Sequence, residues 1–216
     1  MLAAFGDNLF NPLSFILCLA GVVFLHLSSN LYNDYFDVKH GTDGINYEYF
    51  NAGLNSTMLE GAQLSGGSRA IELGLITLNG TKRLANIMLF LTVFCTLMLL
   101  INSYIVTQSF ENLIMALLIG FIGWFLGYFY TAKPIRLSAR RGLGELAIFL
   151  TFGPLLTLGA YYAISSSTIE LFSQGFYNAI YIGIPFGFLT TNILFINQFP
   201  DTNSDAKTGK NHLVVT

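Results

Sequence analysis

LANIMLFLTVFCTLMLLINSY, residues 84–104, is a mainly apolar stretch without a charged side chain. A helix that crosses the roughly 30 Å hydrocarbon core of a bilayer needs about 20 mostly apolar residues, so this stretch predicts a membrane-spanning helix. Four further stretches share this length and character: residues 12–32, 112–131, 143–164 and 176–197. We therefore expect an all-α fold, a polytopic transmembrane helix bundle with about five spans in a single domain over residues 1–216.

The composition supports a lipid environment. Hydrophobic residues make up 53% of the chain and charged residues only 10%, whereas about a quarter of an ordinary soluble domain is charged. The formal net charge is -2, so the overall charge does not attract nucleic acid. We expect the lipid bilayer as the partner, and a multi-pass protein of the cell inner or plasma membrane.

The ten lysine and arginine residues all fall in alternate segments outside the predicted spans. They occupy residues 33–83, 132–142 and 198–216, whereas the connections at 105–111 and 165–175 contain none. Under the positive-inside rule, the three basic segments are cytoplasmic. Five spans that begin with the N-terminus outside agree with this charge distribution.

The first predicted span is followed by an acidic motif, NDYFDVKHGTD at residues 33–43. Asp34 and Asp37 are three residues apart, so they share one face if the helix continues through them. Asn33 stands beside them, and Asp43 follows a Gly-Thr turn. We interpret these residues as candidate metal and substrate ligands.

A second acidic motif follows the last predicted span, at residues 197–205. Asp201 and Asp205 are four residues apart, again on one helix face, and Asn197 lies one turn earlier. Carboxylates that gather at the end of an apolar bundle repel one another unless a cation lies among them. Mg²⁺ fits best, because it prefers oxygen ligands and is usually held by one or two carboxylates together with substrate phosphates. The alternative for any single aspartate is an ordinary solvated side chain.

A calcium loop is a further alternative for the second motif. Asp201, Asn203 and Asp205 match the first, third and fifth positions of an EF-hand. However, Ala206 replaces the required glycine at the sixth position, and His212 replaces the glutamate at the twelfth.

Several cationic residues suit phosphate oxygens. Arg69 follows two glycines whose backbone amides can face an anion, and Lys207 and Lys210 flank the second acidic motif. Tyr130 ends a predicted span and could orient a substrate, although it equally suits an interfacial aromatic belt. Lys133 is a candidate binding residue that also suits ordinary anchoring on the cytoplasmic side.

Two histidines lie near these motifs. We interpret His26 as a packed residue of the first span and His40 as a possible participant in the site. A cation transporter usually needs ionisable groups near the bilayer midplane, and we expect none in the central turns of the five spans. The sequence therefore favours an enzyme over a transport path.

These motifs, in this order, resemble those of the UbiA superfamily of intramembrane aromatic prenyltransferases. The resemblance rests on NDYFDVKHGTD, on the later Gly-Ser-Arg element, on YTAKPIRLSARRGLGE at 130–145, and on NQFPDTNSDAKTGKNHLVV at 197–215. It is strongest to the 1,4-dihydroxy-2-naphthoate prenyltransferases of menaquinone biosynthesis. It implies Mg²⁺-dependent transfer of a polyprenyl group from a prenyl diphosphate to an aromatic acceptor, with 4-hydroxybenzoate, another ring or a glycerol phosphate as alternative acceptors.

The resemblance also implies roles for individual residues. The implied metal ligands are Asp34, Asp37, Asp43, Asp201 and Asp205. The implied catalytic residues are Asp34, Asp37, Asp201, Asp205 and Arg69. The implied binding residues are Asn33, Arg69, Tyr130, Lys133, Asn197, Lys207 and Lys210. Together they place the active site on the cytoplasmic side of the membrane.

The chain also departs from the family pattern. Members usually have about nine spans, and the first helix and the last three have no counterpart here. We therefore expect an incomplete prenyltransferase domain, and a non-catalytic relative is a further alternative. Lys133 stands where related naphthoate enzymes often have a small residue.

Overall fold

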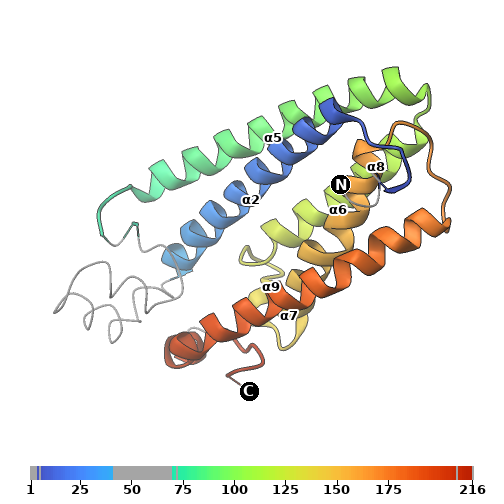
Figure 1. Ribbon diagram of the computed structural model, residues 1–216. Helices are drawn as coiled ribbons and strands as arrows, with labels where there is room; N and C mark the ends of the chain where they lie inside the picture. Colours follow the sequence, from blue (N-terminus) through green and yellow to red (C-terminus); the bar gives the residue numbers. More distant parts are fainter. Residues whose placement is uncertain (1–3, 5, 41–69, 72, 208, 216) are drawn as a thin grey trace.

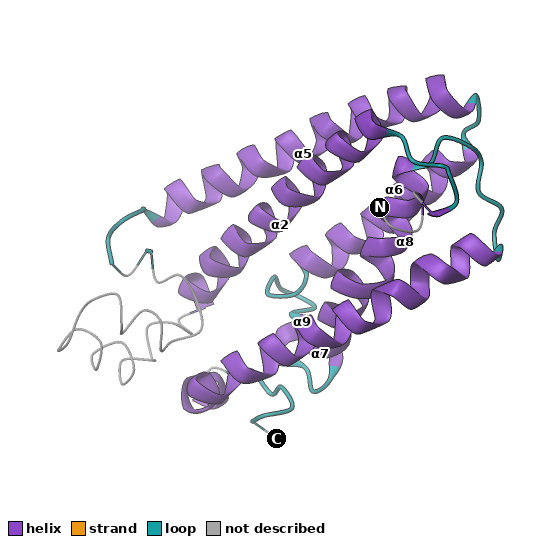
Figure 2. Cartoon of the chain, viewed as in Figure 1, coloured by secondary structure: helices purple, strands orange, loops and turns teal. Residues whose placement is uncertain are grey.

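The computed structural model describes residues 4, 6–40, 70–71, 73–207 and 209–215, and every regular element in these ranges is helical (Figure 2). The elements are α2 (Pro12–His40), α5 (Leu78–Thr107), α6 (Glu111–Tyr128), the 3-10 helix η2 (Leu137–Ala139), α7 (Leu143–Leu150), the π-helical turn η3 (Thr151–Leu155), α8 (Leu156–Ile164) and α9 (Gln174–Lys207). The helical side chains that lie outside the description are those of His40, Pro200, Asp201, Asn203 and Ser204.

Five segments of the described chain are long and apolar enough to cross a membrane. They are Pro12–Lys39, Leu78–Thr107, Glu111–Tyr128, Leu143–Ile164 and Gln174–Phe199. Each overlaps one of the five stretches predicted from the sequence. The expected all-α, polytopic fold is thereby confirmed, and the protein is an integral membrane protein.

Helices α2 and α9 extend beyond the apolar stretches that predict them. The first stretch ends at residue 32, but α2 continues to His40, because no glycine or proline interrupts residues 33–40. The last stretch ends at residue 197, and α9 continues to Lys207. Asp34, Asp37 and Asp205 therefore lie on the final turns of long helices.

The fourth span consists of two helices joined at a bend. Gly142 precedes α7 with φ of 75°, a left-handed conformation that favours glycine. The bend itself is η3, where Gly153 leaves helical geometry before Pro154. A Cβ on Gly153 would lie 2.8 Å from the backbone oxygen of Gly183, so α9 crosses this bend at backbone contact.

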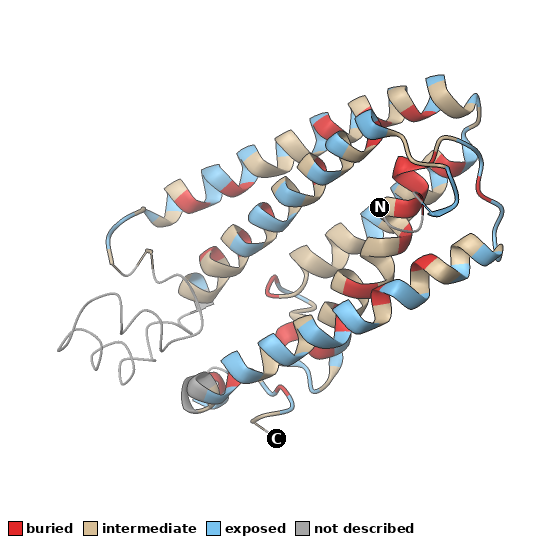
Figure 3. Cartoon of the chain, viewed as in Figure 1, coloured by how far each residue is buried: buried red, intermediate tan, exposed pale blue. Residues whose placement is uncertain are grey.

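The helices form two groups (Figure 1). Helices α2 and α5 lie side by side along their length, and α6, α7, α8 and α9 form the second group. The buried core lies mainly at one end, where Tyr161, Tyr162 and Ile164 of α8 pack together. Elsewhere large apolar side chains such as Phe186 and Ile193 of α9 are exposed, as expected of a surface in contact with lipid (Figure 3).

The end of α2, the connection between α6 and α7, and the C-terminal tail all lie at one end of the bundle (Figure 1). This end carries the described parts of the two acidic motifs and most of the described basic residues. The connection between α5 and α6 and the segment before α9 lie at the opposite end. The fold therefore gathers the polar motifs at one end of an apolar bundle.

Candidate active site

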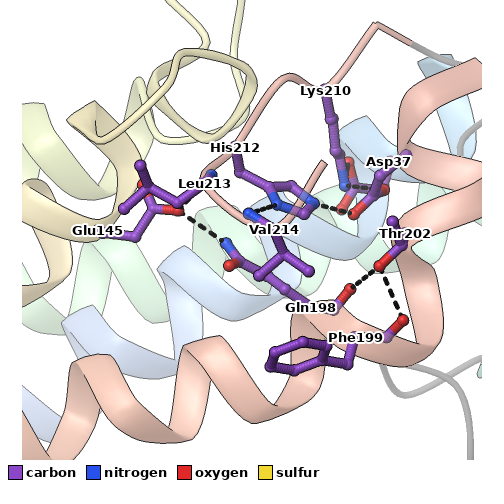
Figure 4. A network of polar contacts seen from close by, with 10 residues as sticks. Asp37, Glu145, Gln198, Phe199, Thr202, Lys210, His212, Leu213 and Val214 are labelled. Carbon is purple, nitrogen blue, oxygen red and sulfur yellow. Dashed lines mark hydrogen bonds and ion pairs between the residues drawn. The ribbon is translucent and has the colours of Figure 1, made fainter. Parts of the chain in front are cut away.

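The two acidic motifs meet through Lys210. The Nζ atom of Lys210 lies 3.1 Å from Oδ1 of Asp37 at the end of α2, and 3.5 Å from Oδ1 of Asp205 at the end of α9 (Figure 4). These three side chains are mostly buried, with exposed fractions of 12%, 19% and 8% respectively. Two segments separated by more than 160 residues of sequence thus share one cation.

The tail after α9 turns back to bring Lys210 into place. Gly209 has φ of 74°, and the amide of Lys210 donates to the backbone oxygen of Asp205 across 2.9 Å. The amide of Asn211 donates to the backbone oxygen of Ala139 across 3.2 Å. The tail is therefore held against both α9 and the connection that contains η2.

His212 supports Asp205 from the other side. Its ring is 2% exposed, and Nε2 lies 2.9 Å from Oδ2 of Asp205. Because the amide of Val214 donates to Nδ1 across 3.3 Å, Nε2 carries the proton that is donated to Asp205. No sequence pattern predicts this role, because His212 matches no metal or phosphate motif and differs from the glutamate that a calcium loop requires.

Glu145, in the first turn of α7, forms a second buried contact with the tail. Its exposed fraction is 5%, and Oε1 accepts from the amide of Leu213 across 3.1 Å and from Nε2 of Gln198 across 3.3 Å (Figure 4). Gln198 is buried, whereas the predicted binding residue Asn197 is exposed. The prediction named Asn197 and not Gln198, because the residue types do not show which face of α9 points inward at its end.

Tyr130 lies close to all these carboxylates. Burial raises the pKa of its phenol above the ordinary value, and the negative charge of Glu145 raises it further. The carboxylates of Asp37 and Asp205 act in the same direction. The phenol therefore keeps its proton at physiological pH and is available as a hydrogen-bond donor.

Asn33 connects α2 to the segment after α6. Its Oδ1 accepts a hydrogen bond of 2.8 Å from Oγ1 of the buried Thr131. Asn33 and Tyr130 also line a cavity of about 830 Å³ between α2, α5, α6 and the α7–α8 bend. The ionic cluster and the cavity therefore adjoin each other.

The cavity wall is mainly apolar, with leucine, isoleucine, valine and phenylalanine side chains from α2, α5, α6 and the span that α7, η3 and α8 form. His26 and Asn30 of α2 are exposed polar residues on this wall. His26 was interpreted as a packed residue, but the structure packs only one side of its ring, against Phe152, and leaves the side chain exposed on this wall. The reason is that the open space beside α2 comes from tertiary packing, which residue order alone does not reveal.

The remaining predicted residues are dispersed. Asp34 is half-buried on α2, whereas Lys133 and Lys207 are exposed. Asp43, Arg69 and the side chains of His40 and Asp201 lie outside the described residues. Within the described ranges, no three histidine, cysteine, aspartate or glutamate side chains are grouped closely enough to hold a metal by themselves.

Long apolar helices with two carboxylates and a lysine at one end, beside an apolar cavity, define a multi-pass membrane protein with a candidate site at that end. The profile of the UbiA prenyltransferase family matches residues 1–216, and the chain belongs to this family. The family resemblance seen in the sequence is thereby confirmed.

Individual relatives have names that are more specific than the family description. A 1,4-dihydroxy-2-naphthoate octaprenyltransferase of Escherichia coli is 28% identical over 212 residues, which cover 98% of this chain and 60% of the relative. A 2-carboxy-1,4-naphthoquinone phytyltransferase of Synechocystis is 40% identical over 91 residues, 42% of this chain and 27% of the relative. A UbiA prenyltransferase domain-containing protein 1 of Dictyostelium discoideum is 26% identical over 206 residues, covering 93% of this chain and 52% of the relative.

The chain thus spans no more than 60% of the length of these relatives. No solved structure matches the chain.

Proposed function

We propose that this protein transfers a polyprenyl group from a prenyl diphosphate to an aromatic acceptor, and that the acceptor is 1,4-dihydroxy-2-naphthoate in menaquinone biosynthesis. The observation that carries the proposal is that the Asp37–Lys210–Asp205 cluster adjoins a largely apolar cavity of about 830 Å³. A prenyl diphosphate has the same two parts, an anionic head and a long apolar chain. The naphthoate acceptor follows from the names of the relatives.

Mg²⁺ is the proposed cofactor, and the residues fit it. Oxygens of Asp37 and Asp205 already converge on one cation, the ammonium of Lys210. Mg²⁺ is usually held by one or two carboxylates plus substrate phosphates, so a group of three protein ligands is not required. When bound, Mg²⁺ would neutralise the charge that develops on the diphosphate as it leaves.

The residues of the chain would act around this centre. The ammonium of Lys210 would pair with diphosphate oxygens, and the phenol of Tyr130 would donate to the same head group. The side chains of Asp43, Asp201 and Arg69, predicted from the sequence, would complete the binding of metal and phosphate.

The proposed reaction begins with cleavage of the allylic carbon–oxygen bond, whose electron pair leaves with the diphosphate. The aromatic carbon that bears the carboxylate then bonds to the allylic carbon. Carbon dioxide leaves from that ring position, and its bonding electrons restore the aromatic ring. The apolar cavity supports this reaction because it limits the access of water, which would otherwise capture the allylic cation.

We also propose that the ionic cluster faces the cytoplasm. The three lysine- and arginine-containing segments flank the end of the bundle that holds the cluster, as the positive-inside rule predicts for a cytoplasmic face.

The test is transfer of a labelled prenyl group in membranes that contain the protein, with and without Mg²⁺. Wild-type protein should prenylate the naphthoate, and Asp37→Asn and Asp205→Asn should each lower the rate at least about 100-fold, as expected for lost metal ligands. Parallel reactions with 4-hydroxybenzoate and glycerol phosphate decide the acceptor. Full activity of both variants would overturn the site, and transfer only to another acceptor would overturn the naphthoate assignment.

A further inference from the structure

His26 and Asn30 form a hydrogen-bonded pair on the wall of the cavity. Nε2 of His26 lies 3.2 Å from Nδ2 of Asn30, one helical turn later on α2. The ring of His26 also meets the ring of Phe152 edge to face at 5.3 Å, across the cavity on the η3 bend. The pair therefore faces the cavity.

Three other polar side chains on the wall already have hydrogen-bond partners. The hydroxyls of Thr92 and Thr96 on α5 donate to backbone oxygens of their own helix, at 3.0 and 2.8 Å. Asn33 accepts from Thr131. These groups therefore have less capacity to bind a ligand than the His26–Asn30 pair.

The pair keeps hydrogen-bonding capacity after its internal bond is made. If Nδ2 of Asn30 donates to Nε2 of His26, then Nδ1–H of the ring and Oδ1 of the amide face outward as one donor and one acceptor. If the amide is flipped, Nε2–H of His26 donates to Oδ1 of Asn30. Nδ1 of the ring is then the free acceptor, and Nδ2 of the amide is the free donor. In both arrangements the pair matches a hydroxyl group, which donates and accepts.

The pair lies near the middle of a long apolar helix. The midpoint of the Pro12–Lys39 span falls beside His26, where polar side chains are costly and usually mark a functional path or site. This differs from the expectation that the central turns lack ionisable groups. The helix extends to His40, so its midpoint lies further along the chain than the midpoint of the apolar stretch.

The pair is also aligned with the ionic cluster. His26, Asn30, Asn33 and Asp37 are spaced by four, three and four residues, which places them on one face of α2. The helical rise puts Asn30 about 4.5 Å and His26 about 10.5 Å from Asn33 along the axis. A two-ring aromatic molecule that meets the allylic carbon near Asn33 would extend toward both residues.

We propose that the His26–Asn30 pair binds ring hydroxyl groups of the aromatic acceptor, and so sets its orientation and the preference for a two-ring diol. This inference rests on the proposed function and assigns the acceptor subsite within it. Both residues act by hydrogen bonding, and the prenyl chain occupies the apolar remainder of the cavity.

The experiment compares His26→Leu, Asn30→Leu and His26→Gln in the full chain, in lipid nanodiscs. Binding of 1,4-dihydroxy-2-naphthoate is measured by its fluorescence without prenyl diphosphate, and KM is then measured for each substrate. The two leucine variants should weaken acceptor binding and raise its KM about 5- to 10-fold, the value of one or two hydrogen bonds. The KM for the prenyl diphosphate should stay within about twofold, and His26→Gln should retain most of the binding because its amide also donates and accepts.

A matched control lies at the opposite end of the bundle. Gln174 and Asn178 at the start of α9 form an exposed pair with the same four-residue spacing, at 2.9 Å. Asn178→Leu makes the same chemical change as Asn30→Leu outside the cavity, and should leave both KM values unchanged.

The outcomes separate the two proposals. If wild-type protein transfers prenyl groups but the leucine variants bind the naphthoate normally, the acceptor subsite is wrong and the proposed function stands. Equal rises in both KM values would show a general structural effect and also overturn the subsite. If wild-type protein transfers no prenyl group to the naphthoate, the assignment to that acceptor fails, and the subsite fails with it.

Discussion

His212 holds the carboxylate of Asp205 through a hydrogen bond of 2.9 Å from Nε2 to Oδ2. The opposite oxygen of the same carboxylate, Oδ1, faces the ammonium of Lys210. Asp205 is thus fixed in rotation by a buried imidazole on one side and is directed toward the shared cation on the other. Outer partners of this kind orient ligating carboxylates in metal sites.

The first prediction concerns His212. Replacing it with leucine removes the donor to Asp205, so the metal concentration that gives half-maximal activity should rise about 10-fold or more. His212→Gln keeps an N–H donor and should stay within about threefold of wild type. Titration with Mn²⁺ followed by electron paramagnetic resonance measures the same affinity without turnover. Wild-type Mn²⁺ affinity in the leucine variant would contradict the orienting role.

The second prediction concerns the charge of Lys210. Without it, Asp37 and Asp205 would face each other largely buried and without their shared cation, so Lys210→Met should lower the free energy of unfolding by about 3 kcal/mol in metal-free buffer. Added Mg²⁺ should raise the melting temperature of this variant more than that of wild type, because the metal replaces the lost positive charge. Lys210→Arg is the control that keeps the charge. Equal Mg²⁺ effects on the methionine variant and wild type would refute this explanation.

Much of the fold could be predicted from the sequence, because long uncharged stretches permit few structures in a bilayer. The five spans follow from them directly. The end of α2 could not be placed as well, because polar residues continue a helix when no glycine or proline stops it. The end of α9 was also missed, because this helix continues through Pro200 to Lys207. The extension of α2 also places His26 near the middle of the helix.

The candidate site was only partly predictable. Residue type and spacing predict Asp37, Asp205 and Lys210 as site residues, and the structure brings these three side chains together. The contacts of Glu145, Gln198 and His212 depend on how the tail folds back after Gly209, which is a tertiary property. No local pattern distinguishes these residues from ordinary polar ones.

The third prediction concerns the phenol of Tyr130. The pKa of this group is raised in the folded protein, so the folded state holds the proton more tightly than the unfolded state does. The resulting stability is fully present below the ordinary tyrosine pKa of about 10 and is lost as pH rises through the higher folded-state value. Between pH 9 and about 11.5, wild type should therefore lose stability more steeply than Tyr130→Phe, as measured by thermal unfolding in detergent. Parallel pH profiles for the two proteins would contradict the prediction.

The fourth prediction concerns the crossing of α9 over the α7–α8 bend. A Cβ on Gly187 would lie 2.7 Å from the backbone oxygen of Phe149, which cannot move without displacing α7. Gly187→Ala should therefore lower the free energy of unfolding by about 1–3 kcal/mol, the usual effect of overpacking. Gly120→Ala is the matched control, because apart from its chain neighbours and the nearby backbone of α6 nothing lies within 4 Å of its added Cβ, and it should be neutral or slightly stabilising through its higher helix propensity. Chemical unfolding in mixed micelles measures both. If the two variants are equally stable, α9 does not cross the bend at backbone contact, and the position of α9 against the α7–α8 span must be revised.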